Sequence, residues 1–365
     1  MNKNILLTLM SLNTGGAETH AISLARELSN RGYNVVVASA GGCLVKRLEE
    51  NNIKHYSVPL NTKNPWAIFQ ALTRLNSVIQ ENHIDLIHAH ARIPAWISVK
   101  LGKKYNKPVV TTSHGIYSAG YILKTLTKWG DWVIAVSEDV KEHLIKNFGY
   151  PPERITVISN GIDLTEFNSV QKPRIKREEK SIIYISRLED ARGEIAVKLI
   201  NCAPKIKREF NNVSFTIVGE GNKLNKIKKR AAAENSKAVK PYINVLGART
   251  DIPDLLNLSD IAVGVGRVAL EAMAMGKPVV AAGEAGFMGI IDEHNFEKGK
   301  KHNFSGRGFA RETTENLLAE NIKTLLQNEK LCEKLGEFGR NMVKENFSIE
   351  TMTDKIIQVY RKAGL

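Results

Sequence analysis

Two arginines stand close together in segment 185–193 (ISRLEDARG), which follows a short β-branched run. Guanidinium groups form short, bidentate hydrogen bonds to phosphate oxygens, so Arg187 and Arg192 can hold a diphosphate that departs with negative charge. The alternative is a pair of surface arginines, one of them in an ion pair with Glu189 or Asp190. The residues alone leave both interpretations open.

Two glycine turns have the composition of ligand-binding loops. Gly15 and Gly16 separate a predicted strand from a predicted helix, where glycine lets the backbone approach a ligand and the helix offers free N–H groups to an anion. The alternative is a tight turn that uses glycine only for a positive φ. Gly219 and Glu220 lie in a second turn of this kind, which is a weaker signal on its own.

A third glycine turn precedes a short helix in segment 264–280 (GVGRVALEAMAMGKPVV). Gly266 and Arg267 belong to the turn, and Glu271 lies near the start of the helix, where its carboxylate can accept hydrogen bonds from sugar hydroxyls. The alternative is a first-turn acid that complements the helix dipole. Residues 264–269 also match the dinucleotide fingerprint, with Glu284 as the acid that follows, so an NAD-dependent oxidoreductase is a competing prediction.

One histidine is well placed for chemistry. His114, in segment 111–115 (TTSHG), ends a predicted strand beside a glycine, and His88 and His90 have a similar but weaker placement. No Asp-x-Asp occurs, and no His, Cys or carboxylate group has ligand spacing. We therefore expect neither a catalytic metal nor a cofactor.

The first 165 residues must position the first turn and His114. Hydrophobic periodicity predicts strands at 5–10, 34–38, 55–59, 84–88, 108–112, 132–136 and 155–158. It predicts helices at 17–31, 45–51, 65–82, 93–105 and 138–147, the last capped by Ser137. Such alternation indicates a parallel sheet covered on both faces, a doubly wound domain over 1–165.

The second half repeats this architecture after a polar, proline-containing linker at 166–180. The predicted strands are 181–185, 213–218, 243–246, 261–263 and 278–281, and the predicted helices are 194–210, 223–234, 252–258, 268–275 and 312–345. A second α/β domain therefore covers 181–345, with a further helix at 350–363. In such sheets ligands bind beyond the carboxyl ends of the strands, so we expect the two domains to face a cleft.

Net charge and composition limit the kinds of binding partner that the sequence predicts. The 365 residues have a formal net charge of +14, which solvated helix faces, an anionic ligand or the negative inner face of a membrane can each explain. No nucleic-acid-binding motif accompanies the charge, so nucleic acid is not expected. No apolar run is long enough for a membrane span, and Cys43, Cys202 and Cys332 are far apart, which predicts a cytoplasmic protein.

Segment 117–129 mixes aromatic, aliphatic and lysine residues just after His114. With the lysines upstream it predicts a peripheral contact with an anionic membrane. Those lysines are Lys100, Lys103, Lys104 and Lys107. The alternative is a helix that buries Ile122, Leu123 and Leu126 while its lysines face water.

In order along the chain, these segments resemble the retaining GT-B glycosyltransferases of family 4. The matching motifs are GGAE at 15–18, HG at 114–115, SNGID at 159–163, SRL at 186–188 with a base five residues after Arg187, and EAMAMGKPVV at 271–280. The resemblance implies two Rossmann-like domains, with a C-terminal segment 346–365 that packs back on the N-terminal domain.

The resemblance also implies roles for individual residues. Arg187 and Arg192 would neutralise the donor diphosphate in place of a divalent ion, although the family usually has Lys at position 192. His114 would contact the donor sugar, and Glu271 the nucleotide ribose. The remaining donor contacts implied are Gly15, Gly16, Gly219, Glu220, Arg249, Gly266 and Arg267, with Arg249 beside the nucleobase.

The implied reaction moves a sugar from a nucleotide-sugar to a glycan or lipid-linked acceptor, with retention and without a side-chain nucleophile. One departure is clear: the family has a glutamate eight residues before its second glutamate, and here that position is Val263. The first glutamate normally contacts the donor sugar. A non-catalytic nucleotide-sugar-binding protein, or an epimerase on a related fold, therefore remains an alternative.

Overall fold

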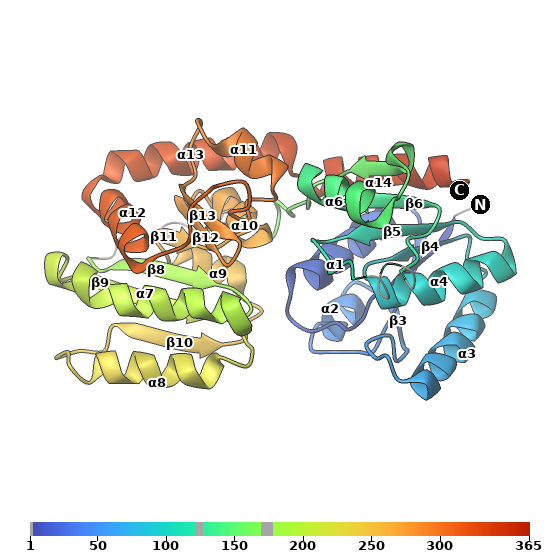
Figure 1. The fold of residues 1–365 in the computed structure, drawn as a ribbon, viewed down its shortest axis with the longest axis horizontal. Coiled ribbons are helices and arrows are strands. Elements are labelled where there is room, and N and C mark those ends of the chain that lie inside the picture. Colours follow the sequence, from blue (N-terminus) through green and yellow to red (C-terminus); the bar gives the residue numbers. More distant parts are fainter. Residues whose placement is uncertain (1–2, 121–123, 125–126, 169–177) are drawn as a thin grey trace. The chain divides into compact units, whose positions relative to one another are not determined.

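The computed structural model describes residues 3–120, 124, 127–168 and 178–365. The chain forms two compact units (Figure 1). Unit 1 contains Met1–Gly161 and Ile349–Leu365, and unit 2 contains Ile162–Ser348. Unit 1 is thus built from two separate stretches of sequence, whereas unit 2 is continuous.

Unit 1 is organised around a parallel sheet with the strand order β3-β2-β1-β4-β5-β6-β7. Its strands are β1 (Asn4–Thr8), β2 (Asn34–Ser39), β3 (Lys54–Ser57), β4 (Leu86–Ala89), β5 (Val109–Ser113), β6 (Trp132–Ala135) and β7 (Ile155–Val157). Its helices are α1 (Gly16–Asn30), α2 (Val45–Glu49), α3 (Pro65–Glu81), α4 (Arg92–Tyr105), α6 (Glu138–Phe148) and α14 (Ile349–Ala363).

Both faces of this sheet are buried, because successive strand residues point to opposite sides. Ile5 and Leu7 pack in one core with α1, α2 and α14, whereas Leu6 packs in another with α3 and α4. Helix α14 contributes Met352, Ile356 and Tyr360 to the first core. Residues from the end of the sequence thereby complete unit 1.

Unit 2 has the strand order β10-β9-β8-β11-β12-β13. Its strands are β8 (Lys180–Ile185), β9 (Val213–Val218), β10 (Ile243–Gly247), β11 (Ile261–Val263), β12 (Val279–Gly283) and β13 (Gly286–Ile290). Its helices are α7 (Asp190–Glu209), α8 (Leu224–Asn235), α9 (Ile252–Asn257), α10 (Arg267–Ala274), α11 (Phe296–Lys301), α12 (Glu315–Gln327) and α13 (Glu329–Asn346). Ile182 and Tyr184 face one core and Ile183 and Ile185 the other.

The predicted fold class, two Rossmann-like doubly wound α/β domains, is confirmed. Three local predictions were incomplete or wrong. Strand β13, which is antiparallel to β12, and helix α11 were not predicted. The helical stretch 312–345 is two helices, because the Asn328 side chain accepts a hydrogen bond from Leu331 N and begins a new one. Ser137 stands at the cap position, but its hydroxyl bonds Asp139 instead of the helix backbone.

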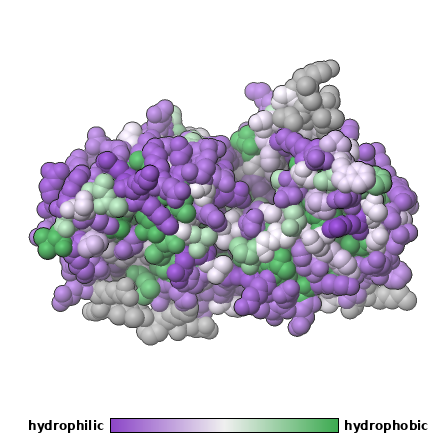
Figure 2. All heavy atoms as spheres, turned by 90° about the horizontal axis from the view of Figure 1, so that it is seen from below, coloured by the Kyte–Doolittle hydropathy of each residue, from purple (hydrophilic) through white to green (hydrophobic). Residues whose placement is uncertain are grey.

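Each sheet reverses its strand order at one place, between β1 and β4 in unit 1 and between β8 and β11 in unit 2. The loops beyond the carboxyl ends of strands at such a reversal are the usual ligand-binding places of open α/β sheets. The GGAE and SRL motifs follow β1 and β8, two strands at these reversals, and the HG motif follows β5, the neighbour of β4. Within the described residues, no helix is both long and apolar enough to cross a bilayer. Figure 2 shows one face on which hydrophilic residues predominate and apolar residues form small groups.

Candidate functional site

In unit 2 two of the predicted loops touch each other. Leu188 N donates a hydrogen bond to Glu220 O at 2.8 Å, which joins the loop after β8 to the turn after β9. This contact needs glycine on both sides of Glu220. Gly219 and Gly221 have φ values of 146° and 154°, and a Cβ at Gly219 would lie 1.8 Å from Ser186 O. The turn therefore packs tightly beside Arg187.

Arg192 lies in the first turn of α7, one helical turn beyond the loop that holds Arg187. Both arginines are exposed. Arg192 Nε donates to Glu284 Oε1 at 2.8 Å, so its partner follows β12 and is neither of the neighbouring acids that the sequence suggested. A half-exposed pair of this kind is weak, and a phosphate can displace the carboxylate.

The third predicted loop enters α10. Gly266 stands at the helix N-cap with φ 61°, a conformation that favours glycine. Glu271 lies in the second turn, and the first turn contains no acid, so the helix-dipole interpretation is wrong. The carboxylate Oε1 of Glu271 instead accepts a hydrogen bond from Arg267 Nε at 2.8 Å, with 8% and 6% of the two side chains exposed.

Arg249 follows β10, the edge strand, and β9 separates it from β8. Its Nε donates to Asp251 Oδ1 at 2.7 Å. That hydrogen bond lowers the pKa of the Asp251 carboxyl below its usual value. The structure thus brings together the loops of Arg187, Glu220 and Glu284, while Arg249 lies farther along the same edge.

In unit 1 the glycine turn precedes α1. Gly15 is the N-cap residue with φ 176°, an extended conformation open to any residue, so a positive φ does not explain this glycine. Because the N-cap residue is a glycine, no side chain caps the first N–H groups of the helix. The first backbone N–H groups of α1 can therefore serve an anion that approaches the glycines closely.

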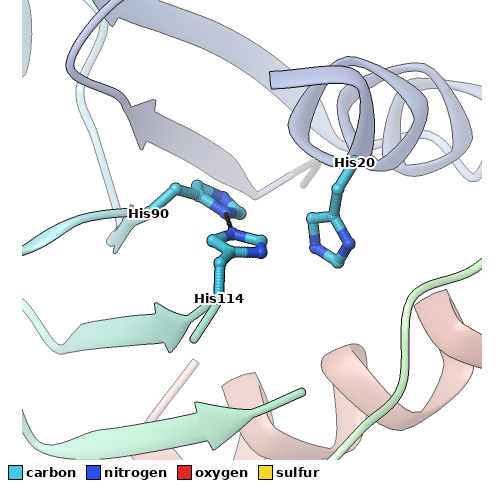
Figure 3. A group of neighbouring side chains, drawn as sticks. All are labelled: His20, His90 and His114. Atoms are coloured by element: carbon cyan, nitrogen blue, oxygen red, sulfur yellow. Dashed lines mark hydrogen bonds between the residues drawn. The ribbon is translucent and has the colours of Figure 1, made fainter. Parts of the chain in front are cut away.

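Three histidines converge beyond the carboxyl ends of β1, β4 and β5 (Figure 3). His90 follows β4, His114 follows β5, and His20 lies in the second turn of α1. One ring nitrogen from each lies within 4.8 Å of the others, and His90 Nδ1 is 3.2 Å from His114 Nε2. His114 was predicted as a site residue and His90 weakly, whereas His20 was missed.

Burial keeps the inner histidines neutral. Desolvation lowers the pKa of His90 well below its usual value, and burial together with the nearby His114 lowers the pKa of His88 to about 3. His88 is not part of the cluster, because its two ring nitrogens form hydrogen bonds with the hydroxyl groups of Tyr360 and Thr112. His20 Nδ1 lies 3.1 Å from Asn160 Oδ1, an acceptor, so Nδ1 donates and Nε2 keeps a lone pair.

The predicted membrane segment falls partly outside the described residues, since Ile122, Leu123 and Leu126 are not among them. The upstream lysines are described. Lys100 lies over the Trp96 ring at 3.9 Å, Lys104 donates to Asn76, and Lys107 pairs with Asp85 at 3.6 Å. An exposed apolar pair lies elsewhere in unit 1, at the start of α3. The rings of Trp66 and Phe69 are stacked, and the two residues are 68% and 60% exposed.

Two family models match the chain almost end to end. Residues 14–166 match the family described as Glycosyltransferase Family 4, and residues 166–342 match Glycosyl transferases group 1. An uncharacterized glycosyltransferase of Methanocaldococcus jannaschii is 25% identical over 96% of this chain and 95% of its own. A UDP-Gal:alpha-D-GlcNAc-diphosphoundecaprenol alpha-1,3-galactosyltransferase of Escherichia coli is 23% identical over 91% and 90%.

Solved structures give the same fold. A glycosyltransferase from Rickettsia africae superposes with a TM-score of 0.77 at 24% identity, over 99% of this chain and 98% of that one. The Anabaena protein HepE, solved in complex with UDP-glucose, superposes with a TM-score of 0.75 at 20% identity, over 98% and 99%.

Proposed function

The chain is a GT-B glycosyltransferase, made of a Glycosyltransferase Family 4 domain and a Glycosyl transferases group 1 domain, and on this premise we propose that it transfers a sugar from a nucleotide-sugar donor with retention and without a metal ion. The observation that supports the donor class is the grouping of Arg187 and Arg192 beside the glycine turn at Gly219. These cations and backbone groups suit a diphosphate.

The donor would lie along the carboxyl edge of the unit 2 sheet. Arg187 and Arg192 are assigned to bind the diphosphate. The incoming phosphate displaces the Glu284 carboxylate from its ion pair with Arg192. The ribose is assigned to Glu271, whose carboxylate is oriented by Arg267. Arg249 is assigned to the nucleobase. The UDP-glucose complex of HepE, a protein of the same fold, supports a uridine donor as the first choice.

The chemical step needs little from side chains. The acceptor hydroxyl oxygen bonds the anomeric carbon on the face that the diphosphate leaves, and the bond from that carbon to the phosphate oxygen breaks. The departing phosphate oxygen takes the acceptor proton. Charge grows on this phosphate, so fixed guanidinium groups stabilise the transition state more than the bound donor. No carboxylate nucleophile is assigned.

Val263 occupies the position where the family has its first glutamate. A valine side chain cannot hydrogen-bond a sugar, so the donor-sugar contacts are assigned to the backbone of the turn at Gly264–Gly266 and to His114. This assignment predicts that donor-sugar recognition depends on shape at the turn more than on an ionised group. A protein that only binds the donor is the competing function, because the usual contact is missing.

The acceptor is assigned to unit 1, and we favour a lipid-linked glycan. The Escherichia coli relative named above has a diphosphoundecaprenol acceptor, at 23% identity. The exposed stacked pair Trp66–Phe69, with Lys63 just before it, has the composition of a membrane-surface contact: aromatic rings that sit at the lipid headgroups beside a cation. A peripheral position at an anionic membrane would place the enzyme near such an acceptor.

A thermal-shift panel of UDP-, GDP- and ADP-sugars tests the donor class. A donor at 100 times its Kd adds about 2.7 kcal/mol to the free energy of unfolding and so raises Tm, whereas a wrong base adds nothing. Arg187→Ala should abolish the shift, and Arg208→Ala, an exposed arginine at the far end of α7, should keep it. A panel in which no nucleotide-sugar raises Tm contradicts the proposal. A shift without donor hydrolysis or transfer supports the binding-only alternative.

A further inference from the structure

The histidine cluster of unit 1 has a geometry that the transfer reaction does not require. His20, His90 and His114 come from three different elements, yet their rings stack or meet edge to face, with centroids 4.9 to 5.6 Å apart (Figure 3). His20 and His90 are buried, and His114 is partly exposed. A sugar contact needs one imidazole. Three that converge on one place suit a different ligand.

The spacing of the ring nitrogens suits a tetrahedral ion. Ligand nitrogens about 2.0–2.1 Å from zinc stand about 3.3 Å from one another. His90 Nδ1 and His114 Nε2 are already 3.2 Å apart, and the three ligand atoms all lie within 4.8 Å of one another. A side-chain movement of about 1 Å would therefore bring all three nitrogens to zinc-binding distance.

The surroundings prepare two of the rings for a metal. Asn160 Oδ1 accepts the hydrogen bond of His20 Nδ1 and leaves the Nε2 lone pair of that ring for an ion, the usual second contact of a metal-binding histidine. His90 Nε2 is buried and makes no hydrogen bond with any described residue, so His90 can ligate through either nitrogen.

We propose that His20, His90 and His114 form a binding site for a zinc ion, with water in the fourth position. Imidazole is a good ligand for zinc and for cobalt, whereas hard cations such as Mg²⁺ prefer oxygen and would bind poorly here. The site should therefore bind zinc and cobalt in preference to Mg²⁺. It contains none of the residues assigned to the donor diphosphate, so it does not make the transfer reaction metal-dependent.

Occupation of the site has a consequence that rests on the proposed function. His114 is assigned to the donor sugar, and a histidine bound to zinc cannot also bond a sugar hydroxyl through the same nitrogen. Zinc is therefore an inhibitor of transfer. Turnover should fall as one equivalent binds, and a chelator should restore it.

Direct binding tests the site without any substrate. EDTA-treated protein is titrated with Zn²⁺ in competition with a chromophoric chelator, and one equivalent should bind. His114→Gln and His20→Asn should each weaken binding by at least about 100-fold, because three ligands become two. The matched control is His83→Asn, an exposed histidine of unit 1 with φ 47°, a conformation that asparagine adopts well.

Cobalt distinguishes this site from the cysteines, of which Cys43 is exposed. Bound Co²⁺ should show the visible absorption of a four-coordinate ion without a near-ultraviolet thiolate band. A thiolate band, less than one equivalent bound at micromolar zinc, or undiminished binding by His114→Gln would overturn the site. If His20→Asn fails to fold, His114→Gln and the wild-type cobalt spectrum still decide the question.

Inhibition is measured separately. If zinc binds but turnover is unchanged at saturation, the site stands and its role as an inhibitor is wrong. The donor-dependent Tm shift is recorded in EDTA, so a failure of the proposed function appears there and a failure of the zinc site does not.

Discussion

The Tyr360 hydroxyl lies 2.7 Å from Nδ1 of His88, a contact between residues that are 272 positions apart. The other ring nitrogen of His88 is 2.7 Å from the Thr112 hydroxyl. His88 and Tyr360 are fully buried. Burial raises the pKa of Tyr360 well above its usual value, so its hydroxyl stays protonated. This bond ties α14 to the centre of the unit 1 sheet.

We expect the His88 contact to weaken in acid. Its pKa is about 3 in the folded protein and about 6.5 in an unfolded chain, so the unfolded state binds more protons between these values. The free energy of unfolding should therefore fall as pH decreases below about 6.5, by up to about 1.4 kcal/mol per pH unit. At neutral pH His88→Gln should be the less stable protein. By pH 5 its deficit should shrink by about 2 kcal/mol in urea unfolding with EDTA present. A deficit that does not change with pH would contradict this prediction.

Loss of either diphosphate arginine should depress turnover. Arg187→Ala and Arg192→Ala each remove a fixed charge that stabilises the departing phosphate, at a cost of about 2–4 kcal/mol in kcat/KM. Both side chains are exposed, so the far-ultraviolet circular dichroism and Tm should stay near those of the wild type. Arg208→Ala is the control. Near-normal turnover in both variants would remove these arginines from the diphosphate.

Chelators should not lower the rate of transfer. The assigned charge on the donor is balanced by guanidinium groups, and Mg²⁺ has no role in that arrangement. Steady-state rates in excess EDTA should equal or exceed those of untreated enzyme. Loss of activity that Mg²⁺ or Mn²⁺ restores would show that the diphosphate needs a divalent ion.

The ion pair between Arg267 and Glu271 should matter for stability. Removal of one partner leaves a charge in a buried place, so Arg267→Leu should lower the free energy of unfolding by about 3 kcal/mol. The double variant Arg267→Leu, Glu271→Leu should lose less than the sum of the two single changes. Additive losses in this double-mutant cycle would mean that the two side chains do not depend on each other.

The aromatic pair at the start of α3 should direct membrane binding. Wild-type protein should co-sediment with anionic liposomes at low salt and much less with neutral ones, since each lysine near such a surface contributes about 1 kcal/mol and salt screens it. Trp66→Ala with Phe69→Ala should reduce this binding. Val239→Ala, an exposed apolar residue of unit 2, is the control. Equal binding by both variants would assign the contact to another surface, and no binding would favour a soluble acceptor.

The sequence predicted the fold because strand and helix periods are local. The strand end at His114 and the turn at Gly15 could be located for the same reason. Contacts between loops could not, because they depend on strand order: His90 meets His114 only because β4 lies beside β5. His20 was missed because helix periodicity drew attention to the buried apolar face of α1 at Leu24 and Leu28.

The ion-pair partners of charged residues also could not be predicted from the sequence. Arg192 pairs with Glu284, 92 positions away, although acids stand directly beside it in the sequence. The helix α10 begins at Arg267, one residue earlier than predicted, which places Glu271 in the second turn and within reach of that arginine. In both cases a long-range strand neighbour or a helix boundary decided the contact.

The discontinuous sequence of unit 1 has a consequence for synthesis on the ribosome. Domains fold as units, beginning with those whose sequence is complete. Unit 2 is complete once Ser348 has emerged, but unit 1 must wait for Ile349–Leu365 although its first residues were made first. During that interval the parts of α1, β5 and β6 that pack against α14 stay open to solvent, and His88 lacks its hydrogen bond to Tyr360. The part of the chain made first is therefore the part that depends longest on chaperones.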